Sequence, residues 1–252
     1  MTKHFQCTSC GKCCYGQLPL TSKDAFANVE RFPLCLVWTP VQQGSKDFKR
    51  VSEIGTTIKL ADRKELAVLI VPTSFIPSSF PCPALRDDNL CGIHSDKPSR
   101  CRTMPFYPYR EERYQAELLT PRQGWECDTS TDAPLVFQNN KIIPRDDFDR
   151  EGNDLSEQVP MLRRYSDYML KYSYSLISSL TIAAQSGKSG QIVTSLSSFL
   201  TATKNPNAKQ IAQHQFPILE SYVAKTAGDP ALLHFHQNYT NWAKEMAYLA
   251  RQ

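Results

Sequence analysis

The feature that most restricts how this chain can fold is a cluster of four cysteines near its start, Cys7-x2-Cys10-x2-Cys13-Cys14. Two-residue spacers let a tight loop direct several sulfur atoms toward one point, and Gly11 tolerates the positive φ that such a loop needs. Buried core cysteines have no reason to recur at this spacing. The pattern is typical of a metal-binding loop and matches part of the ferredoxin C-x2-C-x2-C run. The fourth ferredoxin cysteine and its proline do not follow in register.

A second group of cysteines lies farther along the chain. Together the groups supply eight candidate metal ligands, which are Cys7, Cys10, Cys13, Cys14, Cys82, Cys91, Cys101 and Cys127. Eight thiolates suit two four-ligand sites, because tetrahedral zinc and a cubane iron–sulfur cluster each take four ligands. One multinuclear site fits the count equally well. The adjacent pair Cys13 and Cys14 has diverging side chains and is compatible with two different sites.

One further cysteine and three histidines are considered as additional metal ligands. Cys35 lies in an apolar run and is predicted to be a buried core thiol. His94 follows Cys91 at a spacing that zinc ligands use, but eight thiolates already suffice, so a neighbouring polar role is favoured. His234 and His236 are two residues apart and lie on different helix faces, so they are not a metal-binding pair.

Composition bears on how the cysteines are interpreted. The net charge is only +4 and no dense Lys/Arg block occurs, so nucleic acid is not an expected partner. No secretory signal precedes Cys7 and no apolar run approaches a membrane span, so we expect a cytoplasmic protein without a membrane partner. Clustered cysteines in that compartment are more often metal ligands than disulfides. Lys12, Arg100 and Arg102 adjoin ligand candidates and would offset thiolate charge.

The distribution of residue types predicts two unlike parts. All nine cysteines and most of the 17 prolines precede residue 130, whereas the later sequence shows helical spacing of apolar residues. The polar, breaker-rich stretch 144–154 is the predicted boundary. The sequence therefore predicts an α+β fold, with an irregular cysteine-rich metal-binding module and a small hairpin or sheet over residues 4–148. A helical region over residues 149–252 is expected to form a C-terminal bundle.

In the first part, Thr21–Asp24 resembles a capping box that opens a short helix. Residues 51–60 and 65–75 are apolar and β-branched, and we predict a hairpin that turns at Ala61–Lys64. Residues 114–119 are predicted as a further strand.

In the second part, apolar spacing predicts four helices, over about residues 162–180, 191–204, 207–226 and 230–249. The third is expected to bend at Pro217, and the fourth begins with the N-cap Asp229 followed by Pro230. The apolar stripe of the fourth helix is predicted to be bundle core and not a cofactor site. Gly187–Ser189 is not a phosphate-binding loop, because Ile182 occupies the position of its first glycine.

Three spaced motifs occur in the order of a known family, and they are Phe5-x-Cys7-x2-Cys10-Gly11-x-Cys13-Cys14, Cys82-Pro83-x-Leu85 and Cys91-x-Ile93-His94-x3-Pro98-x2-Cys101-Arg102-x2-Pro105-Phe106. They resemble the CxxCxxCC, or YkgJ-like, family, which is described as a zinc- or iron-chelating domain. The resemblance covers about residues 4–127 and implies that the eight cysteines are the metal-site residues. Lys97 stands where the family usually has Arg, and His94 where many members have Tyr.

This resemblance leaves three hypotheses for function. The favoured one is a metal-binding protein that holds an iron–sulfur cluster, 4Fe–4S among the options, or zinc or iron ions, for binding, carriage or sensing. Some family members are flagellin lysine N-methylases, so a protein-modifying enzyme that uses S-adenosylmethionine is an alternative. The third is a zinc-stabilised module that recognises a protein partner. The sequence contains neither a Rossmann glycine loop nor a radical C-x3-C-x2-C motif, and whether the chain is an enzyme stays open.

Overall fold

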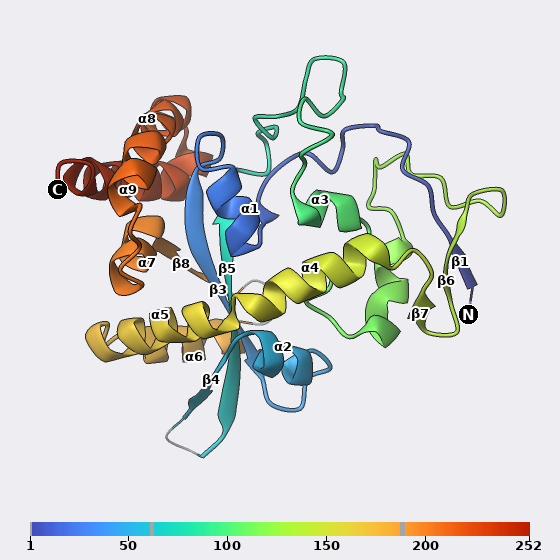
Figure 1. Ribbon diagram of the computed structural model, residues 1–252, viewed down its shortest axis with the longest axis horizontal. Coiled ribbons are helices and arrows are strands. Elements are labelled where there is room, and N and C mark those ends of the chain that lie inside the picture. Colours follow the sequence, from blue (N-terminus) through green and yellow to red (C-terminus); the bar gives the residue numbers. More distant parts are fainter. Residues whose placement is uncertain (1, 61–62, 187–189) are drawn as a thin grey trace.

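The computed structural model describes residues 2–60, 63–186 and 190–252. It contains two antiparallel sheets and a set of helices, so the predicted α+β fold class is confirmed. Figure 1 shows the larger sheet near the centre, the smaller sheet at the right with the N-terminus, and helices α7, α8 and α9 at the left.

The larger sheet has the strand order β2-β5-β3-β8, and β4 also pairs with β5. Its strands are β2 (Leu18–Pro19), β3 (Leu34–Gln42), β4 (Thr56–Lys59), β5 (Glu65–Ser74) and β8 (Ile192–Ser195). The long antiparallel pair of β3 and β5 forms its centre, with a register from Leu34 opposite Ser74 to Gln42 opposite Leu66. Both strands are rich in apolar residues, as expected where helices cover both faces of a sheet.

Strand β5 supplies side chains to two hydrophobic cores, because successive residues of a strand point to opposite faces. The larger core takes Leu66, Val68 and Ile70, and the second core takes Ala67, Leu69 and Val71. Residues of α1 and α5 to α9 complete the larger core, and residues of α2, α4 and the start of α5 contribute to the second.

The helices lie between and after the strands. They are α1 (Ser22–Ala27), α2 (Phe48–Ile54), α3 (Ser99–Thr103), α4 (Asp146–Glu157), α5 (Val159–Tyr172), α6 (Leu176–Gln185), α7 (Leu196–Ala202), α8 (Ala208–Thr226) and α9 (Leu233–Leu249), with 3-10 helices η1 (Glu112–Leu119) and η3 (Pro230–Leu232). Within the described ranges, no helix is both long and apolar enough to cross a membrane.

The smaller sheet comprises β1 (Thr2–His4), β6 (Leu135–Gln138) and β7 (Lys141–Ile142) in the order β1-β6-β7. Its core also takes Leu119 from η1. The strand predicted at residues 114–119 is therefore wrong. The side chain of Gln115 accepts from Tyr107 N and donates to Tyr107 O, both at 2.8 Å, which holds this segment in a helical turn.

Two local predictions for the first part are confirmed, the cap of α1 fully and the hairpin with a shorter first strand. The Thr21 side chain accepts from Asp24 N at 3.1 Å and caps α1 as predicted. Strands β4 and β5 form the predicted hairpin, but residues 51–54 end helix α2 instead of beginning the first strand. Of the predicted turn, Ala61 and Asp62 lie outside the described residues.

The second part differs more from its predicted pattern. The helix predicted at 162–180 is interrupted at Ser173 and becomes α5 and α6. The helix predicted at 191–204 starts later, as α7, because residues 192–195 pair with β3 and the Ser195 side chain caps α7. Helix α8 continues through Pro217, and Asp229 caps the turn before α9 as predicted. Gly187–Ser189 lies outside the described residues.

The larger sheet and the larger core contain residues from both predicted parts of the chain. Strand β8 pairs with β3 along Cys35 opposite Ser195 to Trp38 opposite Ile192. The stretch 144–154, predicted to be the boundary between the two parts, mostly forms α4, which buries Glu151 and Leu155. The division between residues 148 and 149 remains a prediction, and any such division crosses shared core packing.

A buried glutamine joins the C-terminal helices to the first part. Gln215 of α8 has no exposed surface. Its side-chain oxygen accepts from Leu34 N at 2.9 Å, and its side-chain nitrogen donates to the carbonyls of Val29 and Phe32 at 2.5 and 2.8 Å. These bonds place α8 against the entry to β3.

We predict that Gln215→Ala lowers the free energy of unfolding by about 2–4 kcal/mol, because buried backbone groups lose their partners. Urea denaturation followed by circular dichroism measures the loss. Gln213→Ala, on the exposed face of the same helix, is the matched control and should change stability by under ~0.5 kcal/mol. Equal losses in the two variants would contradict the structural role of Gln215.

Candidate metal centre

The N-terminal cysteine loop lies beside the segment that carries Cys127. Gln6 and Asp128 form an antiparallel bridge, with N–O distances of 2.8 and 3.0 Å in the two directions. Cys7 and Cys127 each adjoin one partner of this bridge. Two cysteines far apart in the sequence are thereby brought onto neighbouring stretches of backbone.

The loop between Cys7 and Cys14 curls through residues with positive φ. Ser9 and Gly11 have φ values of 58° and 72°, and Cys14 N donates to the Gly11 carbonyl at 2.9 Å. The positive φ expected at Gly11 is thus confirmed. A Cβ atom on Gly11 would lie 3.1 Å from Asn89 Cβ, so this glycine also lets the loop pack closely on the 86–90 turn.

The contact between Cys14 and Cys82 continues the larger sheet. Strand β2 pairs with the end of β5, and the two segments of the chain remain adjacent as far as the bridge between Tyr15 and Pro81. Cys82 N then donates to the Cys14 carbonyl at 2.7 Å. The register of the sheet therefore sets two of the candidate cysteines side by side.

A tight loop brings Cys91 back toward Cys82. Leu85 and Cys91 form an antiparallel bridge, and Gly92 N donates to the Ala84 carbonyl at 2.7 Å. Leu85 N also donates to the Cys82 carbonyl at 2.9 Å. The two cysteines stand at the two ends of this loop.

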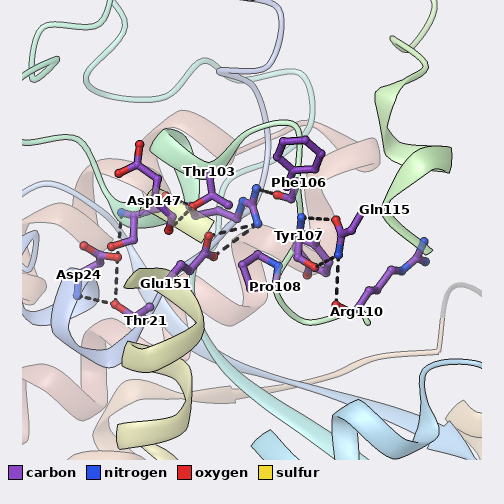
Figure 2. Close-up of polar contacts among 12 residues, drawn as sticks. Thr21, Asp24, Thr103, Phe106, Tyr107, Pro108, Arg110, Gln115, Asp147 and Glu151 are labelled. Atoms are coloured by element: carbon purple, nitrogen blue, oxygen red, sulfur yellow. Dashed lines mark hydrogen bonds and ion pairs between the residues drawn. The ribbon is translucent and has the colours of Figure 1, made fainter. Parts of the chain in front are cut away.

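Helix α3 supplies Cys101, which is partly buried. Its neighbour Arg100 forms an ion pair with Glu151 of α4 at 3.4 Å and donates to the Phe106 carbonyl. Figure 2 shows Thr103 of α3 beside Asp147 of α4, with Glu151 of α4 close by. These contacts hold the backbone of α3 against α4.

Electrostatic interactions divide the cysteines into two neighbourhoods. Burial is the largest cause that raises the pKa of the Cys101 thiol to about 12, and the neighbouring cysteines Cys82, Cys13 and Cys91 contribute to the same rise, in that order. The pKa of Cys82 is raised by burial and, to a smaller extent, by Cys91. Cys14 belongs to the same neighbourhood, because Cys82 and Cys101 both raise its pKa.

The other neighbourhood surrounds Cys127. Burial raises the pKa of its thiol, and Cys10, Cys7 and Cys13 raise it further, in that order. None of the cysteines at positions 14, 82, 91 and 101 is among these causes. Cys13 therefore lies within reach of both neighbourhoods.

Cys13 and Cys14 also act directly on each other. The Cys14 thiol donates a hydrogen bond to the Cys13 sulfur, which is the largest cause that lowers the pKa of Cys13 to about 6. The same bond is the largest cause of the raised pKa of Cys14. The Lys97 ammonium lowers the pKa of Cys13 further. One thiolate next to one thiol is the favoured state of this pair.

Basic side chains offset the negative charge of the thiolates, and they include a residue that the sequence did not predict. Arg100 lowers the pKa of Cys101 while it remains paired with Glu151. Arg102 instead donates to backbone carbonyls, including that of Lys97 at 3.0 Å. Arg31, which the sequence patterns did not single out, lowers the pKa of Cys82. Arg31 lies outside the cysteine motifs, so no spacing could have indicated it.

All nine cysteines are free, so the chain contains no disulfide. Cys35 is fully buried in β3 and belongs to the larger hydrophobic core, as predicted. His94 is exposed on the segment after Cys91. Cys7 and Cys13 are exposed, and the other six candidate ligands are partly buried.

The candidate residues fit a thiophilic metal in chemistry and in the proximity of their backbone segments. Backbone N–H groups already donate to sulfur, from Ser9 to Cys7 and from Ala84 to Cys82, both at 3.4 Å. Such bonds stabilise thiolate charge at metal sites. In the described part of the chain, however, no three His, Cys, Asp or Glu side chains converge as a metal ion requires.

Comparison with known proteins agrees with the motifs. Residues 6–123 match the family CxxCxxCC, whose description is "Putative zinc- or iron-chelating domain". The resemblance predicted from the spaced cysteine motifs is confirmed for this part of the chain, which includes seven of the eight candidate ligands and ends before Cys127. No curated protein and no solved structure matches the chain.

We predict that native, metal-free protein incorporates iodoacetamide fastest at Cys13, which is exposed and has a pKa lowered to about 6, and at Cys35 only after denaturation. The protected thiol is Cys35, because it is buried and burial also raises its pKa well above the ordinary value. Intact mass and peptide mapping identify the labelled cysteines. Rapid native labelling of Cys35 would contradict its assignment to the core.

Proposed function

We propose that this chain is a metal-binding protein that holds zinc, iron or an iron–sulfur cluster through the thiolates of eight cysteines. The observation that carries the proposal is the convergence of four separate segments, which bear Cys7 to Cys14, Cys82 to Cys91, Cys101 and Cys127, on one region of the fold. The match of residues 6–123 to a chelating domain supports the same class of function. A cytoplasmic location is part of the proposal, because clustered thiolates remain reduced in that compartment.

The eight thiolates are proposed to form two sets. The first set is Cys14, Cys82, Cys91 and Cys101, and the second set is Cys7, Cys10, Cys13 and Cys127. Backbone bridges support the pairs Cys14–Cys82 and Cys7–Cys127, and the mutual effects on thiol pKa support the same division except at Cys13, which also acts on Cys14 and Cys101. Cys13 completes the second set, because it is one of the three cysteines that raise the pKa of Cys127 and because each four-ligand centre needs four donors.

The two sets differ in their surroundings, which favours different roles. Cys82 packs against the larger core and Cys101 lies on a helix tied to α4, so the first set suits a stably held metal. The second set includes the exposed residues Cys7 and Cys13. Exposed thiolates are accessible to oxidants and to a second protein. Carriage or sensing is therefore proposed for the second set.

We predict that protein purified without oxygen contains thiolate-bound zinc or iron. Elemental analysis gives the metal, and the absorption spectrum distinguishes an iron–sulfur cluster, which is coloured, from zinc, which is colourless. Acid-labile sulfide, measured in parallel, separates a cluster from iron ions. A folded protein that neither retains metal nor binds added Zn²⁺ or Fe²⁺ would refute the proposal.

We predict that Cys82→Ser and Cys127→Ser each lose about half of the bound metal, because each variant removes one donor from a different set. Metal per chain after gel filtration measures the loss. Cys35→Ser is the matched control and should retain full metal, since its thiol lies in the core. Complete loss of metal in either single variant would favour one multinuclear centre and contradict the two sets.

A further inference from the structure

Helix α3, which carries Cys101, is too short to hold its own orientation. It spans only the five residues Ser99–Thr103. Isolated helices of this length are unstable in water, because the first turn fixes many backbone angles for a single hydrogen bond. The direction of the Cys101 side chain must therefore depend on what holds α3 from outside.

One attachment is a buried ion pair to α4. The side chains of Arg100 and Glu151 are 3% and 0% exposed, and Arg100 Nη1 lies 3.4 Å from both carboxylate oxygens. The guanidinium also donates to the Phe106 carbonyl and lies 5.0 Å from the centre of the Tyr107 ring. Three different groups thus hold a side chain that directly precedes Cys101.

The second attachment joins α3 to α1 and again to α4. Ser99 N donates to Asp24 Oδ2 at 3.0 Å, and the same oxygen accepts from the Thr21 hydroxyl at 2.9 Å. At the other end of α3, Thr103 Oγ1 lies 3.2 Å from the Asp147 carbonyl. Figure 2 shows these contacts on the two sides of the short helix. The Asp24 carboxylate of α1 therefore fixes the start of α3, and the Asp147 backbone carbonyl of α4 contacts its end.

A buried ion pair is a poor way to gain stability, because taking two charges out of water offsets most of their attraction. Its geometric effect is different, since a planar guanidinium with three partners permits one orientation. Nothing in the cysteine motifs requires a carboxylate 51 residues away from Arg100. The arrangement is explained if the orientation of α3 matters to the thiolate at its centre.

We propose that Glu151 and Asp24 are positioning residues for the metal centre, which orient Cys101 toward Cys14, Cys82 and Cys91 by clamping α3 between α4 and α1. This inference rests on the proposed function and adds that metal affinity of the first set depends on carboxylates outside every cysteine motif. Outer groups that orient metal ligands typically change affinity 10–100-fold when they are replaced.

The test is Glu151→Gln, measured in a Cys127→Ser background so that the first set is examined alone. Competition with a chromophoric chelator gives the Zn²⁺ affinity, and we expect a loss of about 10-fold or more. Asp149→Asn is the matched control, because it makes the same change on the same helix at an exposed ion pair with Arg145, and it should stay within about 2-fold. In a Cys82→Ser background, Glu151→Gln should leave the second set within about 2-fold.

The direction in which Glu151→Gln changes the Zn²⁺ affinity distinguishes a positioning role from a purely electrostatic one. Removing a negative charge near four thiolates favours the anionic metal complex, so electrostatics alone predicts tighter binding by Glu151→Gln. Positioning predicts weaker binding. It also predicts a changed Co²⁺ absorption spectrum, because the Co²⁺ ligand field reports the geometry of the sulfur donors. A general loss of stability would alter neither spectrum nor affinity in protein that circular dichroism shows to be folded.

The outcomes distinguish this inference from the proposed function. Wild-type protein that binds no Zn²⁺ or Co²⁺ refutes the proposed function, and this inference with it. Wild-type binding together with unchanged binding by folded Glu151→Gln refutes the inference alone. If Glu151→Gln does not fold, the double variant Arg100→Met, Glu151→Leu removes both charges and is expected to fold. Wild-type affinity at the first set in that double variant would overturn the proposal.

Discussion

The antiparallel pairing of β3 and β5 is the constraint on which the rest of this structure depends. It is the longest pairing in the described part of the chain, and its strands separate two hydrophobic cores. The end of β5 also pairs with β2, and the two segments stay adjacent as far as the bridge between Tyr15 and Pro81, which adjoins Cys14 and Cys82. A shift of one residue in this sheet would move its apolar side chains to the wrong face and displace the cysteine loops together.

The parts of the fold that could be predicted from the sequence are those with strong local signals. Thr21 and Asp229 were identified as helix caps because their side chains bond within the next few residues, a purely local interaction. Residues 192–195 were mistaken for helix because their pairing partner is β3, far away in the sequence. Gln115 was assigned to a strand for the same reason, since its bonds to Tyr107 decide the local conformation and leave no pattern in the sequence.

At the candidate site, too, the sequence identifies only some of the residues that matter. The spaced cysteines identify the donor atoms and the chemical class of ligand, and Gly11 could be recognised as the residue that lets the loop curl. The groups around the donors could not be recognised. Arg31, Asp24 and Glu151 approach the cysteine segments only through tertiary packing, at positions outside the cysteine motifs. A motif defines which residues coordinate, whereas the fold determines how they are held.

Strand β8 has a consequence for how the chain is made. The edge of β3 that carries Cys35 to Trp38 is covered only when residues 192–195 pair with it. During synthesis the segment bearing all nine cysteines emerges first, and domains tend to fold from the N-terminus as they appear. This apolar edge therefore stays unpaired until about residue 195 has left the ribosome, and unpaired edges are sites of misassociation between chains. Nascent chains of this protein are expected to be most prone to aggregation in that interval, while their thiols are already exposed to metal and oxidant.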